Sequence, residues 1–291
     1  MAGIAWVNGR LVAANAPAIA ATDRGFLYGE GLFETMRAYR GRVFRLPQHL
    51  DRLEAGATEI GLSVPPRDSL EGAVHDALAA SGLPEAGVRL TVTPGPAGAE
   101  EPTCVVLVRP LSLPPPERYR TGCAALSVPV AVSRGSSLRG VKSLNYLDKL
   151  LAQRQAERAG AHEALLVDPD GCVVEGAMRN VFAVCAGTLV TPPLSRGLLP
   201  GITRAAVLEL ARQRGFPHAE RDLPLSGLLS AEEAFLTSSL AEILPVASVN
   251  GARLRAAPGP MTRALTEAYR ESVARELGIP NLPDVAPPST D

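Results

Sequence analysis

Lysine is confined to one short stretch of this sequence. The chain has 27 arginines but only two lysines, Lys142 and Lys149. Arginine can replace lysine in ion pairs, but not where an amine must lose its proton and attack a carbonyl. Lys142, near the end of an extended run, is therefore a candidate for an imine with a carbonyl compound. For Lys149, beside Asp148 on an expected helix, we favour chance survival under GC-rich coding, which is also the alternative for Lys142.

A helix start later in the chain could bind an anion. In Leu199-Pro-Gly-Ile-Thr-Arg204, glycine and threonine directly precede an apolar-periodic stretch that predicts a helix. The free amides of the first turn and the Thr203 hydroxyl would suit the phosphate of pyridoxal phosphate, an aldehyde that a lysine can hold as an imine. On its own, Gly-Ile-Thr is explained more simply as a helix cap. The hydroxyls of Thr237-Ser-Ser239 are, on their own, weak evidence for a phosphate site.

A single carboxylate interrupts an apolar stretch. Glu175 lies in Val-Val-Glu-Gly-Ala-Met-Arg-Asn-Val-Phe, where a charge is costly unless it is paired. A regular strand would place Glu175, Ala177 and Arg179 on one face, with Glu175 and Arg179 about 13 Å apart. That separation would suit the two ends of a bound ligand. The alternative is an exposed edge strand with ordinary surface charges.

The segments around these residues predict an α/β protein. Apolar alternation and turn pairs predict strands over 4–12, 33–45, 88–93, 104–108, 123–132, 163–168, 172–185, 188–191, 233–237 and 245–249. Helical spacing predicts helices over about 13 residues after Pro47 and over 68–81, 144–159, 202–214 and 260–277. Residues 23–34 predict a glycine-punctuated loop, and the prolines of 110–120 predict an irregular domain boundary.

Bulk composition excludes several classes of protein. The net charge is −1 and no apolar run approaches the length of a membrane span, so we expect neither a nucleic-acid nor a membrane partner. The N-terminus lacks the order of a signal peptide. The four cysteines form no CxxC pair, which predicts reduced thiols in a cytoplasmic protein. The four histidines show no metal spacing.

Taken together, these segments resemble the fold-type IV pyridoxal-phosphate enzymes, which include branched-chain aminotransferases, D-amino-acid aminotransferases and aminodeoxychorismate lyases. The resemblance runs from Val7-Asn-Gly9 to about Val249-Asn-Gly251. Its motifs, in the family order, are Asp23-Arg-Gly-Phe-Leu-Tyr-Gly-Glu-Gly-Leu-Phe-Glu34, His49-Leu-Asp-Arg52-Leu, Lys142-Ser-Leu-Asn-Tyr146, Glu175-Gly-x-x-x-Asn180-Val-Phe, Leu199-Pro-Gly-Ile-Thr-Arg and Thr237-Ser-Ser-Leu-Ala-Glu-Ile-Leu-Pro-Val. Each motif alone is weak evidence for this family, but six motifs in the family order are specific for it.

The resemblance implies a pyridoxal 5′-phosphate cofactor and a role for each matching residue. Lys142 would form the Schiff base and then carry the proton between the substrate α-carbon and the cofactor C4′. Glu175 would pair with the pyridine nitrogen and keep it protonated. Leu199 would pack on the ring face, and Tyr146 would lie near the phenolic oxygen. The phosphate would be held by Arg52, the amides of Ile202 and Thr203, and the turn Ser238-Ser239.

The resemblance also implies the domain organisation. We expect a small N-terminal α/β domain over 1–115, a linker over 116–125, a larger C-terminal α/β domain with a barrel-like sheet over 126–280, and a disordered tail over 281–291. Members of the group work as homodimers whose sites borrow a loop from the partner, here near Gly25 to Tyr28. Tyr28 and Phe33 could line a substrate pocket, although core packing is an equal alternative.

The favoured reaction is transamination between a 2-oxo acid and a D-amino acid such as D-alanine or D-glutamate. The run from Thr237 to Val246 resembles the transaminase version of that segment, and the run from Lys142 resembles D-amino-acid aminotransferases and many lyases more than branched-chain enzymes. Arg89 and Arg179 would suit a substrate with a carboxylate at each end. They would replace an Arg and a His that Bacillus-type D-amino-acid aminotransferases carry after the strand equivalent to 88–93.

Three alternatives remain open. An aminodeoxychorismate lyase would eliminate pyruvate with the same cofactor, and a branched-chain aminotransferase would act on L-amino acids. A protein of the same fold without the cofactor is the competing class. The retention of Lys142 in so lysine-poor a chain argues against that last reading.

Overall fold

A computed structural model describes residues 3–130 and 138–282, which form two compact units. Unit 1 comprises the chain up to Ser112 together with Val141–Tyr146, and unit 2 comprises Leu113–Gly140 together with the chain from Leu147 onward. The predicted tail over 281–291 falls, from residue 283 onward, outside the described residues. The placement of 141–146 with the N-terminal unit was not predicted, and it assigns Lys142 to that unit.

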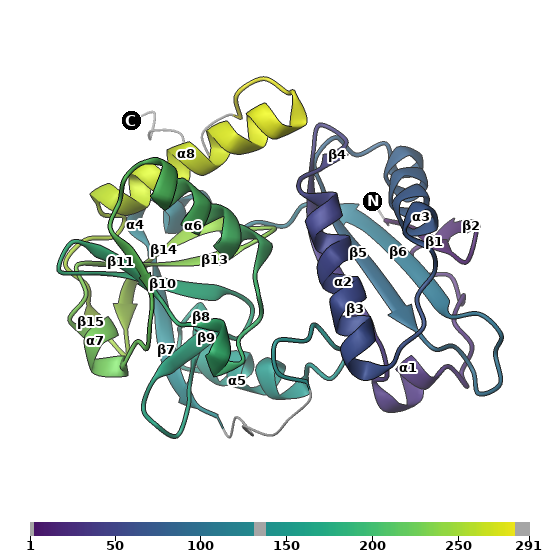
Figure 1. Ribbon diagram of the computed structural model, residues 1–291, viewed down its shortest axis with the longest axis horizontal. Helices are drawn as coiled ribbons and strands as arrows, with labels where there is room; N and C mark the ends of the chain where they lie inside the picture. The colour runs from purple at the N-terminus through teal and green to yellow at the C-terminus, as the bar shows by residue number, and fades with distance from the viewer. Residues whose placement is uncertain (1–2, 131–137, 283–291) are drawn as a thin grey trace. The chain divides into compact units, whose positions relative to one another are not determined.

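Unit 1 is built on a six-stranded antiparallel sheet (Figure 1). In spatial order its strands are β2 (Arg10–Ala13), β1 (Ile4–Val7), β6 (Thr103–Pro110), β5 (Ala86–Thr93), β3 (Leu32–Tyr39) and β4 (Arg42–Val43). The two predicted turns are confirmed. Asn8-Gly9 and Arg40-Gly41 both have positive φ at each central residue, as tight hairpins between right-twisted strands require.

Two amphipathic helices complete the core of unit 1. They are α2 (Leu46–Ile60) and α3 (Arg67–Ser81), which agree with the predicted helices. Their buried leucines and alanines form one apolar cluster with Val88, Leu90 and Val92, the residues that alternate along β5. The predicted loop over 23–34 is corrected in part, because Arg24–Tyr28 forms a short helix, α1, after Asp23, whose carboxylate accepts a hydrogen bond from the Gly25 amide.

Unit 2 contains a nine-stranded mixed sheet. Its strands are β7 (Cys123–Pro129), β8 (Glu163–Val167), β9 (Val173–Gly176), β10 (Asn180–Cys185), β11 (Thr188–Thr191), β12 (His218–Glu220), β13 (Glu233–Ser238), β14 (Glu242–Val249) and β15 (Ala252–Arg253). The spatial order is β12-β11-β10-β13-β14-β7-β8-β9, with β15 paired to β14. The sheet is a curled half-barrel, as predicted. Strand β9 lies at one end of the strand order and β10 lies near the other end, yet a short turn joins the two strands, so the sheet curls to bring its ends together.

That turn corrects the prediction of one strand over 172–185. The Gly176 amide donates a hydrogen bond to the Arg179 carbonyl, so the chain reverses between β9 and β10. Gly176 also lies so close to Glu163 that a Cβ would approach its Oε1 to 2.7 Å. Glu175 and Arg179 therefore do not lie on one face of a regular strand 13 Å apart.

Helices cover this sheet (Figure 1). They are α4 (Pro116–Thr121), α5 (Leu147–Arg158), α6 (Ile202–Gln213), α7 (Leu225–Leu229) and α8 (Pro260–Leu277), with a 3₁₀ turn at Leu194–Arg196. Ala152 and Ala156 of α5 pack with Ala164 and Leu166 of β8, whereas Leu165 packs in a second cluster on the opposite face. The expected linker over 116–125 is corrected, since these residues form α4 and the start of β7.

Candidate active site

The segment that carries Lys142 is fixed beside the first residues of β3. The Phe33 amide donates to the Lys142 carbonyl at 3.0 Å, and the Leu144 amide donates to the Gly31 carbonyl at 2.9 Å. Gly31 has φ 158°, and a Cβ there would lie 2.6 Å from the Val92 carbonyl oxygen. Glycine is therefore required for the strand to start this close to β5 and to receive the Lys142 segment.

Two cations lie against the ring of Phe33. The Arg89 guanidinium carbon is 3.7 Å from the ring centroid, and Lys142 Nζ is 4.4 Å from it. Tyr146 contacts the same ring edge-on at 5.4 Å between centroids. The structure thus brings four predicted residues together, since the amine of Lys142, the guanidinium of Arg89 and the phenol of Tyr146 all lie against the ring of Phe33.

A charged triad fixes Arg52. The fully buried Glu34 accepts hydrogen bonds from Arg52 Nε at 2.8 Å and Nη2 at 2.6 Å, and His49 Nδ1 lies 2.6 Å from the same carboxylate. Burial alone would raise the pKa of Glu34, but attraction and hydrogen bonding from Arg52, aided by His49, lower it to about 2. Burial lowers the pKa of His49. Glu34 was not predicted as a site residue, although a carboxylate inside a buried strand was a signal for it.

The predicted partner-reaching loop is solvent-exposed in the single chain. Phe26, Leu27 and Tyr28 of α1 are 73%, 51% and 65% exposed. Tyr28 contacts the Arg24 guanidinium at 5.3 Å from its ring centroid. The structure therefore places Tyr28 on a small exposed apolar surface, whereas Phe33 is buried against Lys142.

In unit 2, both carboxylate oxygens of Glu175 have partners. Lys149 Nζ, from the first turn of α5, donates to Oε1 at 2.7 Å, and the Leu199 amide donates to Oε2 at 3.2 Å. Glu175 is thus paired, as a buried charge requires, but with a lysine expected to have survived by chance. The rarity of lysine, which pointed to Lys142, applied equally to Lys149.

The loop before α6 is held by Asn180. Its Nδ2 donates to the Leu199 carbonyl at 2.9 Å, so Leu199 is tied by its amide to Glu175 and by its carbonyl to Asn180. A Cβ at Gly201 would overlap Asn180 Oδ1, which explains why the residue before the helix has no side chain. The position of Asn180 within its motif was noted in the sequence, but this role was not predicted.

An anion site is available where α6 begins. Its N-cap is Gly201, which has no side chain with which to cap the first amides, including those of Ile202 and Thr203. Thr237 is the sheet partner of Asn180, and its buried hydroxyl has no hydrogen-bond partner among the described residues. Ser238 follows and accepts from the Ala241 amide in a turn that also contains Ser239. A phosphate fits this set of amides and hydroxyls.

Arg179 is engaged inside unit 2. Its Nη1 forms an ion pair with the fully buried Glu163, whose other oxygen accepts the Met178 amide at 2.7 Å. Arg179 Nε is buried without a hydrogen-bond partner among the described residues. The guanidinium of Arg179 is therefore held in one direction by Glu163.

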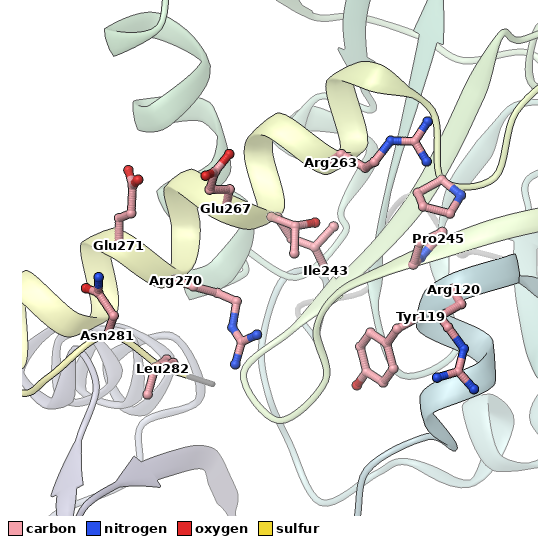
Figure 2. A pocket seen from close by; sticks show the side chains of 12 residues that line it. Tyr119, Arg120, Ile243, Pro245, Arg263, Glu267, Arg270, Glu271, Asn281 and Leu282 are labelled. Carbon is pink, nitrogen blue, oxygen red and sulfur yellow. The ribbon is translucent and has the colours of Figure 1, made fainter. Parts of the chain in front are cut away.

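Other features of unit 2 contribute none of the predicted site residues. A cavity of about 640 Å³ lies between α8, β14 and α4, and the side chains that line it include Tyr119, Ile243, Arg263 and Arg270 (Figure 2). Within residues 3–130 and 138–282, no group of three or more His, Cys, Asp or Glu could hold a metal ion. The helices described there include none that is both long and apolar enough to cross a membrane.

Comparisons with known proteins agree on one family. The profile described as amino-transferase class IV matches residues 31–249. The chain is 37% identical over 276 residues to a putative branched-chain-amino-acid aminotransferase of Methanocaldococcus jannaschii, covering 91% of this chain and 95% of the relative. It is 31% identical over 282 residues to a D-alanine aminotransferase of Bacillus licheniformis, covering 92% and 96%.

Solved structures give the same result. The branched-chain amino acid aminotransferase of Escherichia coli superposes with a TM-score of 0.86 at 29% identity, covering 92% of this chain and 94% of that one. A hypothetical aminotransferase from Mycobacterium tuberculosis in its PLP-bound form gives 0.86 at 26% identity, covering 94% and 100%.

Proposed function

Because this chain belongs to the class IV aminotransferase family, whose members depend on pyridoxal phosphate, we propose that it transfers the amino group of a D-amino acid, such as D-alanine or D-glutamate, to a 2-oxo acid. The observation that carries the proposal is the placement of Arg89 and the Lys142 amine against one ring, that of Phe33. An amino acid whose carboxylate is bound by Arg89 would present its α-carbon to that amine. The likeness to D-alanine aminotransferases supports the D-configuration.

The residues of unit 1 would bind substrate and move a proton. Pyridoxal phosphate, when bound, supplies the electron sink that makes the α-hydrogen of an amino acid acidic. Lys142 Nζ is the group placed to take and return that proton. Arg52, held by Glu34 and His49, presents a fixed cation for a phosphate, and the ring of Phe33 excludes water from one side of the amine.

The residues of unit 2 would bind the cofactor. The amides of Ile202 and Thr203, with the Thr237, Ser238 and Ser239 hydroxyls, would accept a phosphate. Glu175 would hold a proton at the pyridine nitrogen, and Leu199 would pack against the ring. Asn180 would position Leu199 through the hydrogen bond to its carbonyl.

Arg179 is proposed to bind a second carboxylate. Its ion pair with Glu163 fixes the guanidinium, and the 14% of the side chain that stays exposed would present the remaining donors to a carboxylate. A D-glutamate side chain, or the distal carboxylate of a dicarboxylic 2-oxo acid, has the chemistry to fill this position.

Branched-chain L-amino acids are the second candidate substrates. The relative from Methanocaldococcus jannaschii and the Escherichia coli structure both carry that activity in their names. The amine faces aromatic surface from Phe33 and Tyr146, which an apolar substrate side chain could contact.

The test is a substrate comparison. Purified protein loaded with pyridoxal phosphate is given D-alanine, D-glutamate or L-leucine with a non-matching 2-oxo acid, and the new 2-oxo acid is quantified. We expect turnover of the D-amino acids, and R89A should raise KM for the amino acid by about 100-fold while R89K restores part of the loss, because lysine keeps the charge but not the bidentate fork. Turnover of L-leucine alone would contradict the proposal and favour the second candidate.

We also propose that the protein forms a homodimer through α1. The exposed Phe26, Leu27 and Tyr28 form an apolar surface that a second copy would cover. Sedimentation should show a dimer that F26E weakens, and a monomer at all concentrations would contradict this assignment.

A further inference from the structure

Lys149 holds the carboxylate assigned to the cofactor nitrogen. Its Nζ lies 2.7 Å from Glu175 Oε1, and the side chains are 27% and 7% exposed. The Leu199 amide binds the other oxygen, Oε2. Because the Leu199 amide already orients the carboxylate, Lys149 is not needed to point it and acts chiefly through its charge.

The remaining charges near Glu175 do not replace Lys149. Glu163 on β8 is close enough to Glu175 for that negative charge to help raise the pKa of Glu163, but Glu163 forms its own ion pair with Arg179. That pair is neutral as a whole. A buried carboxylate without a counter-ion is costly, so the ammonium of Lys149 stabilises Glu175 in the cofactor-free protein.

We infer that Lys149 is the counter-ion of Glu175 before the cofactor binds and competes with the pyridine nitrogen for Oε1. The inference rests on the proposed role of Glu175, but not on the identity of the substrate. A protonated pyridine brings a second positive charge to a carboxylate that already has one, and the two cations repel each other. Lys149 therefore weakens cofactor binding and makes the pyridine nitrogen release its proton more readily. Lys149 would thus act on the cofactor through Glu175, by its charge, without contacting the reacting atoms.

The test compares K149Q with K149R and R154Q. Arg154 lies on the exposed side of α5, so R154Q removes the same charge from the same helix without touching Glu175. Equilibrium dialysis of each cofactor-free protein against pyridoxal phosphate should show K149Q binding about tenfold more tightly than the wild type. K149R and R154Q should bind like the wild type. The cofactor-free K149Q should also melt at a lower temperature than R154Q.

A spectroscopic measurement separates this role from a merely structural one. With ¹⁵N-labelled pyridoxal phosphate, the nitrogen chemical shift reports protonation of the pyridine ring. In K149Q its midpoint should move up by about one pH unit, and K149R should return it toward the wild type. Equal or weaker cofactor binding by K149Q, or an unchanged midpoint, would overturn the inference. No substrate is used, so a failure here is distinct from failure of the proposed D-amino-acid activity.

Discussion

The substitution G201A tests how the loop before α6 is held. Gly201 has φ −68°, so alanine can adopt its backbone conformation, and any cost must come from the side chain. The added Cβ would overlap Asn180 Oδ1. Asn180 is 5% exposed and cannot move into solvent without losing its hydrogen bond to the Leu199 carbonyl.

The magnitude follows from these two contacts. Overpacking a tight site costs about 1–3 kcal/mol, and the loss of one buried hydrogen bond costs about 1 kcal/mol. We expect G201A to lower the free energy of unfolding of unit 2 by about 2–4 kcal/mol. N180A removes the hydrogen bond and also the atom that the new Cβ would strike. The double variant N180A/G201A should therefore be little less stable than N180A alone, a coupling of about 2–4 kcal/mol.

Urea unfolding of the cofactor-free proteins, followed by far-ultraviolet circular dichroism, measures these differences. G227A is the matched control, because Gly227 lies in a helix of the same unit and an added Cβ would come no closer than 3.8 Å to a neighbour. G227A should be neutral or slightly stabilising. A G201A protein within about 0.5 kcal/mol of the wild type, or a double variant whose loss is the sum of the two single losses, would show that Asn180 does not restrict position 201.

Two further predictions concern unit 1 and the cysteines. Since the pKa of Glu34 is lowered from 4.5 to about 2, its stabilisation is complete above pH 4.5 and is lost as the pH falls toward 2. In an H49Q background, which removes the titration of His49 and one of the two groups that lower the Glu34 pKa, the unfolding free energy reported by Trp6 fluorescence should fall between pH 7 and 3.5 by up to about 1.4 kcal/mol more than in H49Q/E34Q. Burial raises the pKa of the Cys104 and Cys123 thiols to about 12, so a thiol reagent at pH 8 should label neither before the protein unfolds. Rapid labelling of the native protein would contradict their burial.

Local patterns were sufficient for much of the fold. The helices α2 and α3 and the strand β5 follow from apolar periodicity, and their apolar faces form one core. The positive-φ turn at Asn8-Gly9 follows from residues that tolerate that conformation. Helix α1 was missed because five residues are too few for a periodic signal, although Asp23 is a typical N-cap.

The errors arose where the partners are distant in sequence. The strand predicted over 172–185 is broken by a turn that packs on Glu163 of β8, and no local pattern indicates that contact. Lys149 was assigned to chance because its partner, Glu175, is 26 residues away. The pairing of Glu34 with Arg52 and His49 likewise depends on how α2 packs against β3. The residue types were sufficient to predict the chemistry, whereas these pairings could be identified only from the way the helices and strands pack.

We propose that Lys142, and not Lys149, carries the cofactor. The protein loaded with pyridoxal phosphate is reduced with borohydride, digested and examined by mass spectrometry. Since the chain has only two lysines, each site is read directly. We expect a phosphopyridoxyl group on Lys142 alone. A phosphopyridoxyl group on Lys149, or an unmodified Lys142, would show that Lys142 does not carry the cofactor.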